Sequence, residues 1–230
     1  EIRDAVRAQA AAGAQWIKVY ADYRKQKGGA AEPTFALDEL GALVDEATKA
    51  GLPVAAHATT DEGIRRAVLA GVRTIEHGGG ASEATLRAMR ERAVVLVPCL
   101  AANEAIVLQA GRKGPIVDSL NAAKAGLQRA LAAGVTIGCG SNAGVFRHGD
   151  NARELELMVA YGMTPAQALA SATTVAAGVL GAADLGVVRK GARCGLVVLG
   201  ADPLLDIGAL RQVRAVVREG DELWLRRDGR

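Results

Sequence analysis

Two strand-like stretches decide the fold of this chain: Leu52-Pro-Val-Ala-Ala-His57-Ala-Thr-Thr60 and, after a helix-like segment, Gly71-Val-Arg-Thr-Ile-Glu-His77-Gly-Gly79. Each contains a short apolar run that ends in a histidine, and the 230-residue chain has only three histidines. Short apolar runs bounded by glycine are typical of buried parallel strands. We therefore expect His57 and His77 at the carboxyl ends of neighbouring strands.

A helix-then-strand pattern recurs along the chain, with the helices ending at Gly13, Gly51, Gly71, Ala93 and Gly134. Strands are expected at residues 15–20, 54–57, 72–77, 94–99 and 135–140, with a further short strand at 184–191. Loops are expected at 22–33 and, as a loop or broken helix, at 103–114. Ser82 is expected to cap a helix, and capping-box spacing is present at Thr59/Glu62 and at Thr164/Gln167, where a helix is expected at 165–180. Such alternation implies an α/β fold with a parallel sheet and right-handed crossovers. An open doubly wound sheet and a (β/α)8 TIM barrel both have this pattern. The barrel is favoured because its strand ends converge on one mouth, where the polar residues of this chain would gather.

Only five βα units are visible, whereas a closed barrel needs eight. The chain starts at Glu1 in what reads as the middle of a fold, so we expect about three further units ahead of it, and we assign no localisation from this end. We assign residues 1–182 to the carboxyl-terminal portion of the barrel. Residues 183–230 have the short strands and turns of a small β-sandwich appendage.

Composition excludes several partners. The net charge is +3 without long charged runs, which gives no reason to expect nucleic-acid or membrane-surface binding. No apolar run approaches the roughly 20 residues that span a bilayer. Cys99, Cys139 and Cys194 are odd in number and far apart, so we expect buried free thiols rather than disulfides.

His57 and His77 are candidate metal ligands. A single buried histidine is more often structural, but here two occur at the same place in successive units, and glycines follow His77. Adjacent strands lie about 5 Å apart. That spacing suits two imidazoles on one zinc ion, with Zn–N bonds of about 2.0–2.1 Å.

Lys18 lies within an apolar strand, Trp16-Ile-Lys-Val-Tyr20. A buried ammonium group is unfavourable unless it is paired or modified. Three alternatives follow: an ion pair with a carboxylate such as Glu76, a Schiff-base lysine, or a lysine carboxylated by CO2 that bridges metal ions. Strand alternation points Glu76 away from the mouth, which indicates a structural role.

Asn142 follows the last expected strand of the barrel, where a functional residue would lie. An amide is a poor metal ligand and cannot act as a general base. His148 and Arg147 lie in the loop that follows, and Tyr20 lies near the end of its strand. These three residues are candidates for substrate binding, although a surface or helix-capping position is an equal alternative for His148.

Four motifs in this order resemble the amidohydrolase superfamily: Ile17-Lys18-Val-Tyr20, Val54-Ala-Ala-His57-Ala58, Thr74-Ile-Glu-His77-Gly78 and Gly140-Ser-Asn142-Ala-Gly144. The resemblance is to the imidazolonepropionase-like branch, which includes Xaa-Pro dipeptidases, Xaa-Arg/Lys carboxypeptidases and ochratoxin-type amidases. It covers essentially the whole chain, and the four motifs together are far more specific than any one of them.

The resemblance implies two divalent metal ions, commonly zinc, in the barrel mouth. By match, Lys18 is the carboxylated bridging lysine, and His57 and His77 hold the more exposed metal. Asn142 falls where the family has an aspartate that binds the buried metal and acts as the base. The family's His-x-His pair is absent from this sequence, which agrees with a missing front portion.

The function implied is hydrolysis of an amide or peptide bond by a metal-activated water. The substrate would be a small carboxylate-bearing molecule, either a dipeptide or an N-acyl amino acid. Proline dipeptides, basic dipeptides and ochratoxin-like N-aroyl amino acids all remain open. Lys25, Arg147 and Arg153 are candidates for the cation that anchors the carboxylate. Oligomerisation is common in the branch, so a homo-oligomer is expected.

Asparagine is nearly isosteric with aspartate but lacks its basicity, so we expect an inactivated form, with a naturally inactive homologue as the alternative. Two rival classes remain, namely a Schiff-base lyase using Lys18 and a non-catalytic barrel homologue. Neither rival needs two histidines at strand ends, which favours the hydrolase.

Overall fold

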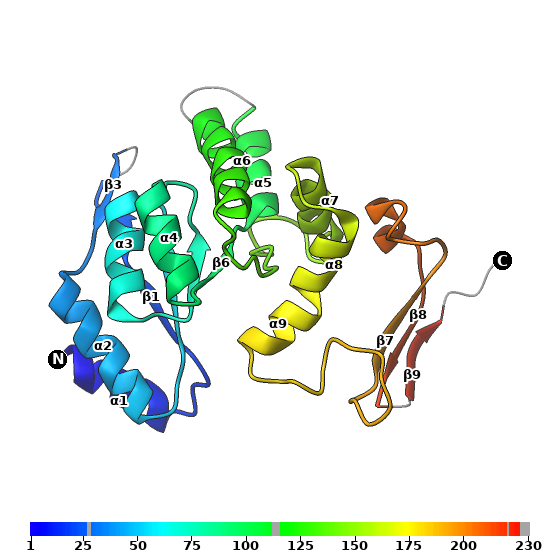
Figure 1. Ribbon diagram of the computed structural model, residues 1–230, viewed down its shortest axis with the longest axis horizontal. Helices are drawn as coiled ribbons and strands as arrows, with labels where there is room; N and C mark the ends of the chain where they lie inside the picture. Colours follow the sequence, from blue (N-terminus) through cyan, green and yellow to red (C-terminus); the bar gives the residue numbers. More distant parts are fainter. Residues whose placement is uncertain (27–28, 112–115, 220, 226–230) are drawn as a thin grey trace. The chain divides into compact units, whose positions relative to one another are not determined.

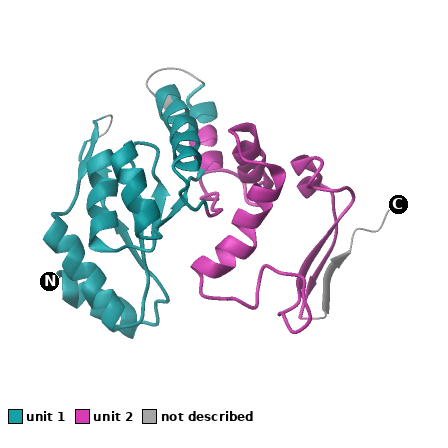
Figure 2. Cartoon of the chain, in the orientation of Figure 1, with its two compact units in different colours: residues 1–99, 106–137 teal, residues 100–105, 138–230 magenta. Residues whose placement is uncertain are grey.

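The chain adopts an α/β fold in a computed structural model that describes residues 1–26, 29–111, 116–219 and 221–225 (Figure 1). It divides into two compact units (Figure 2). The first comprises residues 1–99 and 106–137, and the second comprises residues 100–105 and 138–230. Each unit is described by itself.

A four-stranded parallel sheet forms the centre of the first unit, as the sequence predicted. Its order is β1-β4-β5-β6, made of Ile17–Tyr20, Val54–Ala58, Thr74–His77 and Val95–Val97. Tyr20 pairs with His57 and Ala58 pairs with His77. The carboxyl ends of β1, β4 and β5 therefore lie side by side, with one histidine on each of the last two.

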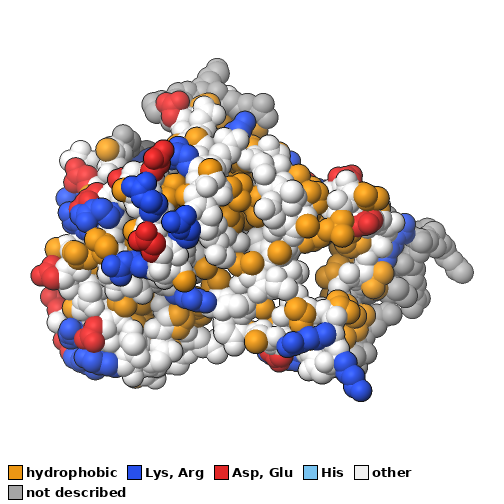
Figure 3. All heavy atoms as spheres, viewed as in Figure 1, with side chains coloured by type: hydrophobic (Ala, Val, Ile, Leu, Met, Phe, Trp, Pro, Cys, Tyr) orange, Lys and Arg blue, Asp and Glu red, His pale blue; other side chains and the backbone are white. Residues whose placement is uncertain are grey.

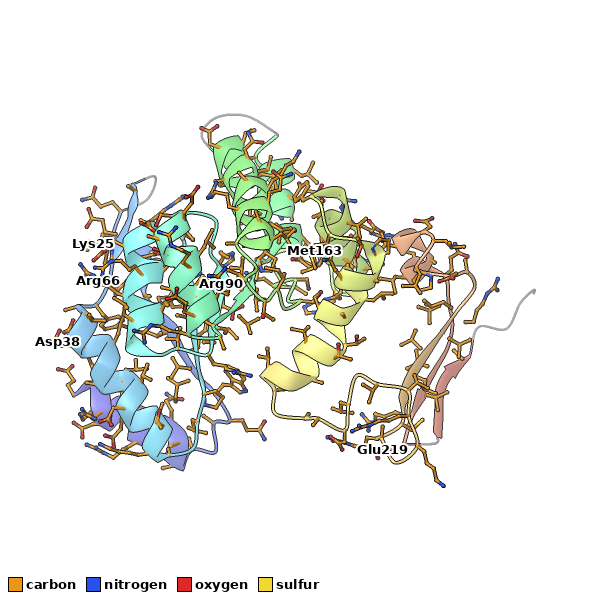
Figure 4. All side chains as sticks on the ribbon, in the orientation of Figure 1. Lys25, Asp38, Arg66, Arg90, Met163 and Glu219 are labelled. Carbon is orange, nitrogen blue, oxygen red and sulfur yellow. The ribbon has the colours of Figure 1, made fainter. Side chains whose placement is uncertain are left out.

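Three helices connect these strands, namely α2 (Leu37–Lys49), α3 (Asp61–Ala70) and α4 (Glu83–Glu91). Helix α1 (Ile2–Ala11) precedes the sheet and α6 (Ile116–Ala132) follows it. Successive helices from α1 to α4 pack against one another, and their apolar faces bury Leu40, Ile64 and Met89. Arg66 on α3, labelled in Figure 4, donates to the Phe35 carbonyl at 2.8 Å. This bond joins α3 to the segment that precedes α2.

Local capping sets where two of these helices begin. The Ser82 hydroxyl accepts from the Thr85 amide at the start of α4, as expected. For α3, the spacing of Thr59 and Glu62 suggested a capping box, but the N-cap is Thr60, whose hydroxyl accepts from the Gly63 amide at 3.1 Å.

Three elements differ from the sequence prediction. The strand expected at 135–140 is represented by a single parallel bridge between Leu96 and Ile137. The expected loop or broken helix at 103–114 falls largely within α5 (Leu100–Gln109), and residues 112–114 lie outside the described residues. Apolar residues are spread around this helix rather than gathered on one face, so it lacks the amphipathic period by which a helix is recognised. The loop expected at 22–33 contains a hairpin of β2 (Asp22–Arg24) and β3 (Ala31–Pro33).

The second unit contains α7 (Ala152–Ala160), α8 (Pro165–Ala172), α9 (Thr174–Val179), the 3-10 helix η1 (Ile207–Arg211) and an antiparallel sheet, β7-β8-β9. The sheet comprises Gly195–Leu199, Val213–Arg218 and Asp221–Leu225. The predicted capping box of Thr164 and Gln167 is present. The helix predicted at 165–180 is interrupted at Thr173, and the strand expected at 184–191 forms turns.

Charged side chains of both signs are intermixed on the helical face of the first unit in Figure 3. Many of them are paired, as Arg7 of α1 is with Glu46 of α2 at 2.7 Å. Within the described residues, no helix is both long and apolar enough to cross a membrane.

Candidate metal centre at the strand ends

The structure brings His57 and His77 together at the ends of β4 and β5. Their ring centroids lie 4.6 Å apart, and the ring planes meet at 70°. Both side chains are half-buried. Two imidazoles at this separation can direct their nitrogens to one ion, which matches the donor chemistry of a zinc site.

Burial controls the protonation of this pair. It lowers the pKa of His57, and it lowers the pKa of His77 to about 4, with further contributions from the positive charges of His57 and Lys18. The carboxylate of Asp22 opposes both shifts. Both rings are therefore neutral near pH 7, and neutral imidazole is the form that binds metals.

Lys18 lies on β1 and is close enough to influence the pKa of both histidines. Its side chain is exposed, because β1 buries Ile17 and Val19 on one face and presents Lys18 and Tyr20 on the other. The expectation of a costly buried ammonium is therefore wrong for this chain. Glu76 accepts a hydrogen bond from the Thr74 hydroxyl at 2.6 Å, and among the described residues no ion pair joins it to Lys18.

Three residues at or just beyond the ends of the strands expected from the sequence share an unusual backbone. His77, Cys99 and Asn142 have φ values of 73°, 53° and 57° although none is glycine. Left-handed backbone at non-glycine residues is uncommon and concentrates at functional sites. Asn142 therefore has the same left-handed backbone conformation as His77. Aspartate tolerates this conformation as readily as asparagine, so the backbone does not select between them.

A buried carboxylate that sequence reasoning missed braces the turn after His57. Asp22 accepts hydrogen bonds from the backbone amides and hydroxyls of both Thr59 and Thr60, at 2.7–3.0 Å. Gly63 permits this arrangement, because a Cβ atom there would lie 2.3 Å from Asp22 Oδ2. In the sequence Asp22 is a single aspartate in an expected loop, and no sequence pattern links it to Thr59 and Thr60.

The turn after His77 is braced in a similar way by Asp61. Its carboxylate accepts from the Ser82 amide at 2.8 Å and from the Thr85 hydroxyl at 2.6 Å. Arg129 of α6 donates to the Gly79 carbonyl at 2.9 Å, and a Cβ atom on Gly126 would lie 2.7 Å from Gly79 Cα. The loops that carry both histidines are therefore held from neighbouring segments of the first unit.

The second unit contains the predicted site residues Asn142, Arg147, His148 and Arg153. Asn142 is exposed, and Arg147 and His148 line a hollow of about 360 Å³ with Gly149 and Asp150. Two of the proposed anchoring cations are already paired, since Lys25 pairs with Glu32 at 2.9 Å and Arg153 with Glu104 at 2.7 Å. Within the described part of the chain, Arg147 has no ion pair.

The described residues contain no cluster of three or more His, Cys, Asp or Glu side chains able to hold a metal ion. The donor set of the first unit is thus two neutral imidazoles with Lys18 beside them. This set fits part of a metal shell, since a zinc site usually has three or four protein ligands.

The chain belongs to the amidohydrolase family, whose model it matches over residues 1–223. The ochratoxinase of Aspergillus niger is 33% identical to it over 243 aligned residues, which cover 97% of this chain and 49% of that protein. The chain thus spans about half the length of this curated relative. These matches confirm the resemblance inferred from the four motifs.

Solved structures give the same result. A Xaa-Pro dipeptidase with methionine bound in its active site is 31% identical, with a TM-score of 0.90, over 96% of this chain and 57% of the other. A putative prolidase from Bifidobacterium longum is 33% identical, with a TM-score of 0.85, over 97% and 59%.

Proposed function

We propose that the complete protein containing this chain is built as a metal-dependent hydrolase for an amide or peptide bond. Its substrate class is a small carboxylate-bearing molecule, either a dipeptide or an N-acyl amino acid. The observation that carries the proposal is the neutral His57–His77 pair at neighbouring strand ends in an amidohydrolase-family chain. The names of the similar proteins, a Xaa-Pro dipeptidase and an ochratoxinase, support this substrate class.

In this proposal His57 and His77 hold one of two divalent ions, most simply zinc. When bound, such ions acidify a water molecule and polarise the scissile carbonyl. Lys18, carboxylated by CO2, would present two oxygens beside the histidines, and its exposed position on the adjacent strand supports that role. Asn142 occupies the position of the family's basic aspartate as a degenerate ligand.

The residue at position 142 determines whether the protein with this sequence can hydrolyse its substrate. A carboxylate at this position could take a proton from the water and pass it to the leaving amine, whereas an amide cannot. We therefore propose that this form binds its substrate without hydrolysing it at a normal rate. A naturally inactive homologue is the alternative.

The test is Asn142→Asp in the complete protein. A positioned general base contributes roughly 10²- to 10⁴-fold, so hydrolysis of an N-acyl amino acid should rise by about that factor. Asn121→Asp, the same change on the exposed surface of α6, is the matched control. If both variants hydrolyse equally slowly, Asn142 is not the cause of inactivity.

Metal binding is tested separately. His57→Ala and His77→Ala should each lower the zinc content measured by elemental mass spectrometry, while His148→Ala should leave it unchanged. Equal zinc in all three variants would contradict the assignment. Borohydride trapping of a carbonyl substrate on Lys18, in protein free of metal, would instead select the Schiff-base lyase.

The architecture of the whole protein is part of the proposal. We infer a (β/α)8 barrel to which residues 1–182 contribute, and a small β-sandwich to which residues 183–230 contribute. The parallel order β1-β4-β5-β6 and the antiparallel sheet β7-β8-β9 support these two parts. A homo-oligomer is proposed from the family and is measurable by light scattering.

A further inference from the structure

Two tyrosines gather beside His57 in a chain that has only three tyrosines. The ring centroids of Tyr20 and Tyr23 lie 5.3 Å apart with their planes at 87°. Tyr20 lies 4.7 Å from His57 with an interplanar angle of 37°, and Tyr23 lies 6.4 Å from His57. The three rings therefore form one aromatic cluster at the ends of β1 and β4.

Both tyrosine rings are exposed, although the backbone between them is buried. Tyr20 is 49% exposed and Tyr23 is 57% exposed, whereas Ala21 and Asp22 are fully buried. Large aromatic side chains usually bury much of their surface, and exposed apolar patches often mark binding sites. This contrast sets the tyrosine pair apart from ordinary exposed side chains.

Hydrogen bonds fix the backbone segment that carries the two tyrosine rings. The Ala21 amide donates to the His57 carbonyl, and the Thr34 amide donates to the Ala21 carbonyl, both at 2.9 Å. Asp22 is fixed by Thr59 and Thr60, and Tyr23 pairs with Glu32 across the hairpin of β2 and β3. The rings are thus fixed at their backbone before any ligand arrives, which reduces the entropy lost on binding.

We propose that Tyr20 and Tyr23 form an aryl-binding face that selects amide substrates carrying a planar aromatic group. The proposal rests on the proposed hydrolase function and names the substrate class of that site. A planar ring can stack on one tyrosine and meet the other edge-on, because the two rings are nearly perpendicular. The contact between Tyr20 and His57 places this face directly beside the proposed metal centre.

The experiment measures equilibrium binding to the complete protein with Asn142 in place. The probes are N-benzoylglycine and N-(cyclohexanecarbonyl)glycine, which share a carboxylate and an amide but differ in ring planarity. Tyr23→Leu should weaken benzoylglycine binding by about ten-fold and cyclohexanecarbonylglycine binding by less than about two-fold. Tyr23→Phe keeps the ring and should bind both probes like the unaltered protein. Tyr20→Leu should repeat the effect of Tyr23→Leu.

Three outcomes would overturn the aryl-binding face. The Leu variants could weaken the binding of both probes equally, they could weaken the binding of neither, or the unaltered protein could fail to bind the probes. A matching unfolding curve for each variant excludes loss of the fold as the cause. The hydrolytic activity of the Asn142→Asp variant distinguishes the proposed hydrolase function from the proposed aryl-binding face. Hydrolysis of N-acetyl amino acids without aryl preference would leave the hydrolase standing and remove the aryl-binding face. Aryl-selective binding without any hydrolysis would do the reverse.

Discussion

Buried or partly buried carboxylates hold the starts of helices in both units. In the first unit these are the helices after β4 and β5, and in the second unit it is the helix that starts at Leu100. In the first unit, Asp22 and Asp61 accept from threonine hydroxyls as well as from backbone amides. In the second, Glu154 accepts only from the Leu100 and Ala101 amides, at 2.9 and 2.7 Å, among the bonds described. The carboxylates of the first unit thus accept from both hydroxyls and amides, whereas the carboxylate of the second unit accepts from amides.

The pKa values of two of these carboxylates, Asp61 and Glu154, shift in opposite directions. Burial alone would raise the pKa of Asp61, but the hydrogen bonds from Thr85 and Ser82 outweigh it, and the pKa is lowered. For Glu154, burial outweighs both amide hydrogen bonds and raises the pKa to about 7. At Asp61 the hydrogen bonds therefore outweigh burial and favour the ionised form, whereas at the more deeply buried Glu154 burial prevails and favours the neutral form.

The largest expected effect comes from Asp22→Asn in the first unit. The change replaces an acceptor oxygen by an NH2 group that faces other donors and removes the charge from the remaining bonds. We expect a loss of about 4 kcal/mol in the free energy of unfolding, since hydrogen bonds to charged groups are individually worth about 1.5–3 kcal/mol. Urea unfolding of the complete protein measures it.

Asp38→Asn is the matched control, at an exposed position in the first turn of α2 (labelled in Figure 4). It should cost only about 0.5 kcal/mol, through a weaker interaction with the helix dipole. Equal losses for Asp22→Asn and Asp38→Asn would show that Asp22 does not brace the turn after His57.

Glu154 should make the stability of the second unit depend on pH near neutrality. Its folded pKa of about 7 lies above the ordinary 4.5, so its favourable contribution is complete below pH 4.5 and is lost as the pH rises through 7. The loss amounts to about 3 kcal/mol. Glu154→Gln cannot titrate, so the difference in unfolding free energy between wild type and variant should shift by that amount between pH 4.5 and pH 8.

Glu156 provides the control on the same helix. The hydrogen bond from Arg211, opposed by burial and aided by Arg153, lowers the pKa of Glu156. Its contribution is therefore present above its unfolded pKa and is lost as the pH falls, which is opposite in sign to that of Glu154. If Glu154→Gln and Glu156→Gln change the pH profile in the same direction, the comparison between the two carboxylates is wrong.

A smaller effect is expected from Gly63→Ala on α3. Alanine favours a helix over glycine by about 1 kcal/mol, but here its Cβ atom would lie 2.3 Å from Asp22 Oδ2. Overpacking of this kind typically costs about 1–3 kcal/mol, so we expect a net loss of about 1 kcal/mol by urea unfolding.

The smallest effect is expected from Gly41→Ala on α2, where a Cβ atom would meet nothing within 4 Å. This substitution should raise the unfolding free energy by about 0.5–1 kcal/mol. Opposite signs at Gly63 and Gly41 would show that the contact with Asp22, and not helix propensity, decides the outcome. A gain at both positions would remove the steric argument.

Much of the first unit was predictable, because its apolar runs and helix ends are local signals. The strands ending in His57 and His77 and the cap at Ser82 are present as expected. The hairpin of β2 and β3 was missed because its strands are three residues long. The exposure of Lys18 was missed because an apolar sequence context does not tell which face of a strand is covered.

The sequence by itself determined the family, the alternation of helices and strands, and the placement of two histidines at successive strand ends. These follow from residue patterns within a single segment, where local periodicity is sufficient. Only the tertiary structure decided that Asp22 braces the turn after His57, that Glu154 holds the start of α5 and that Tyr20 and Tyr23 meet His57. Those contacts join segments that are distant in the sequence, so they depend on strand register and packing, which no local pattern records.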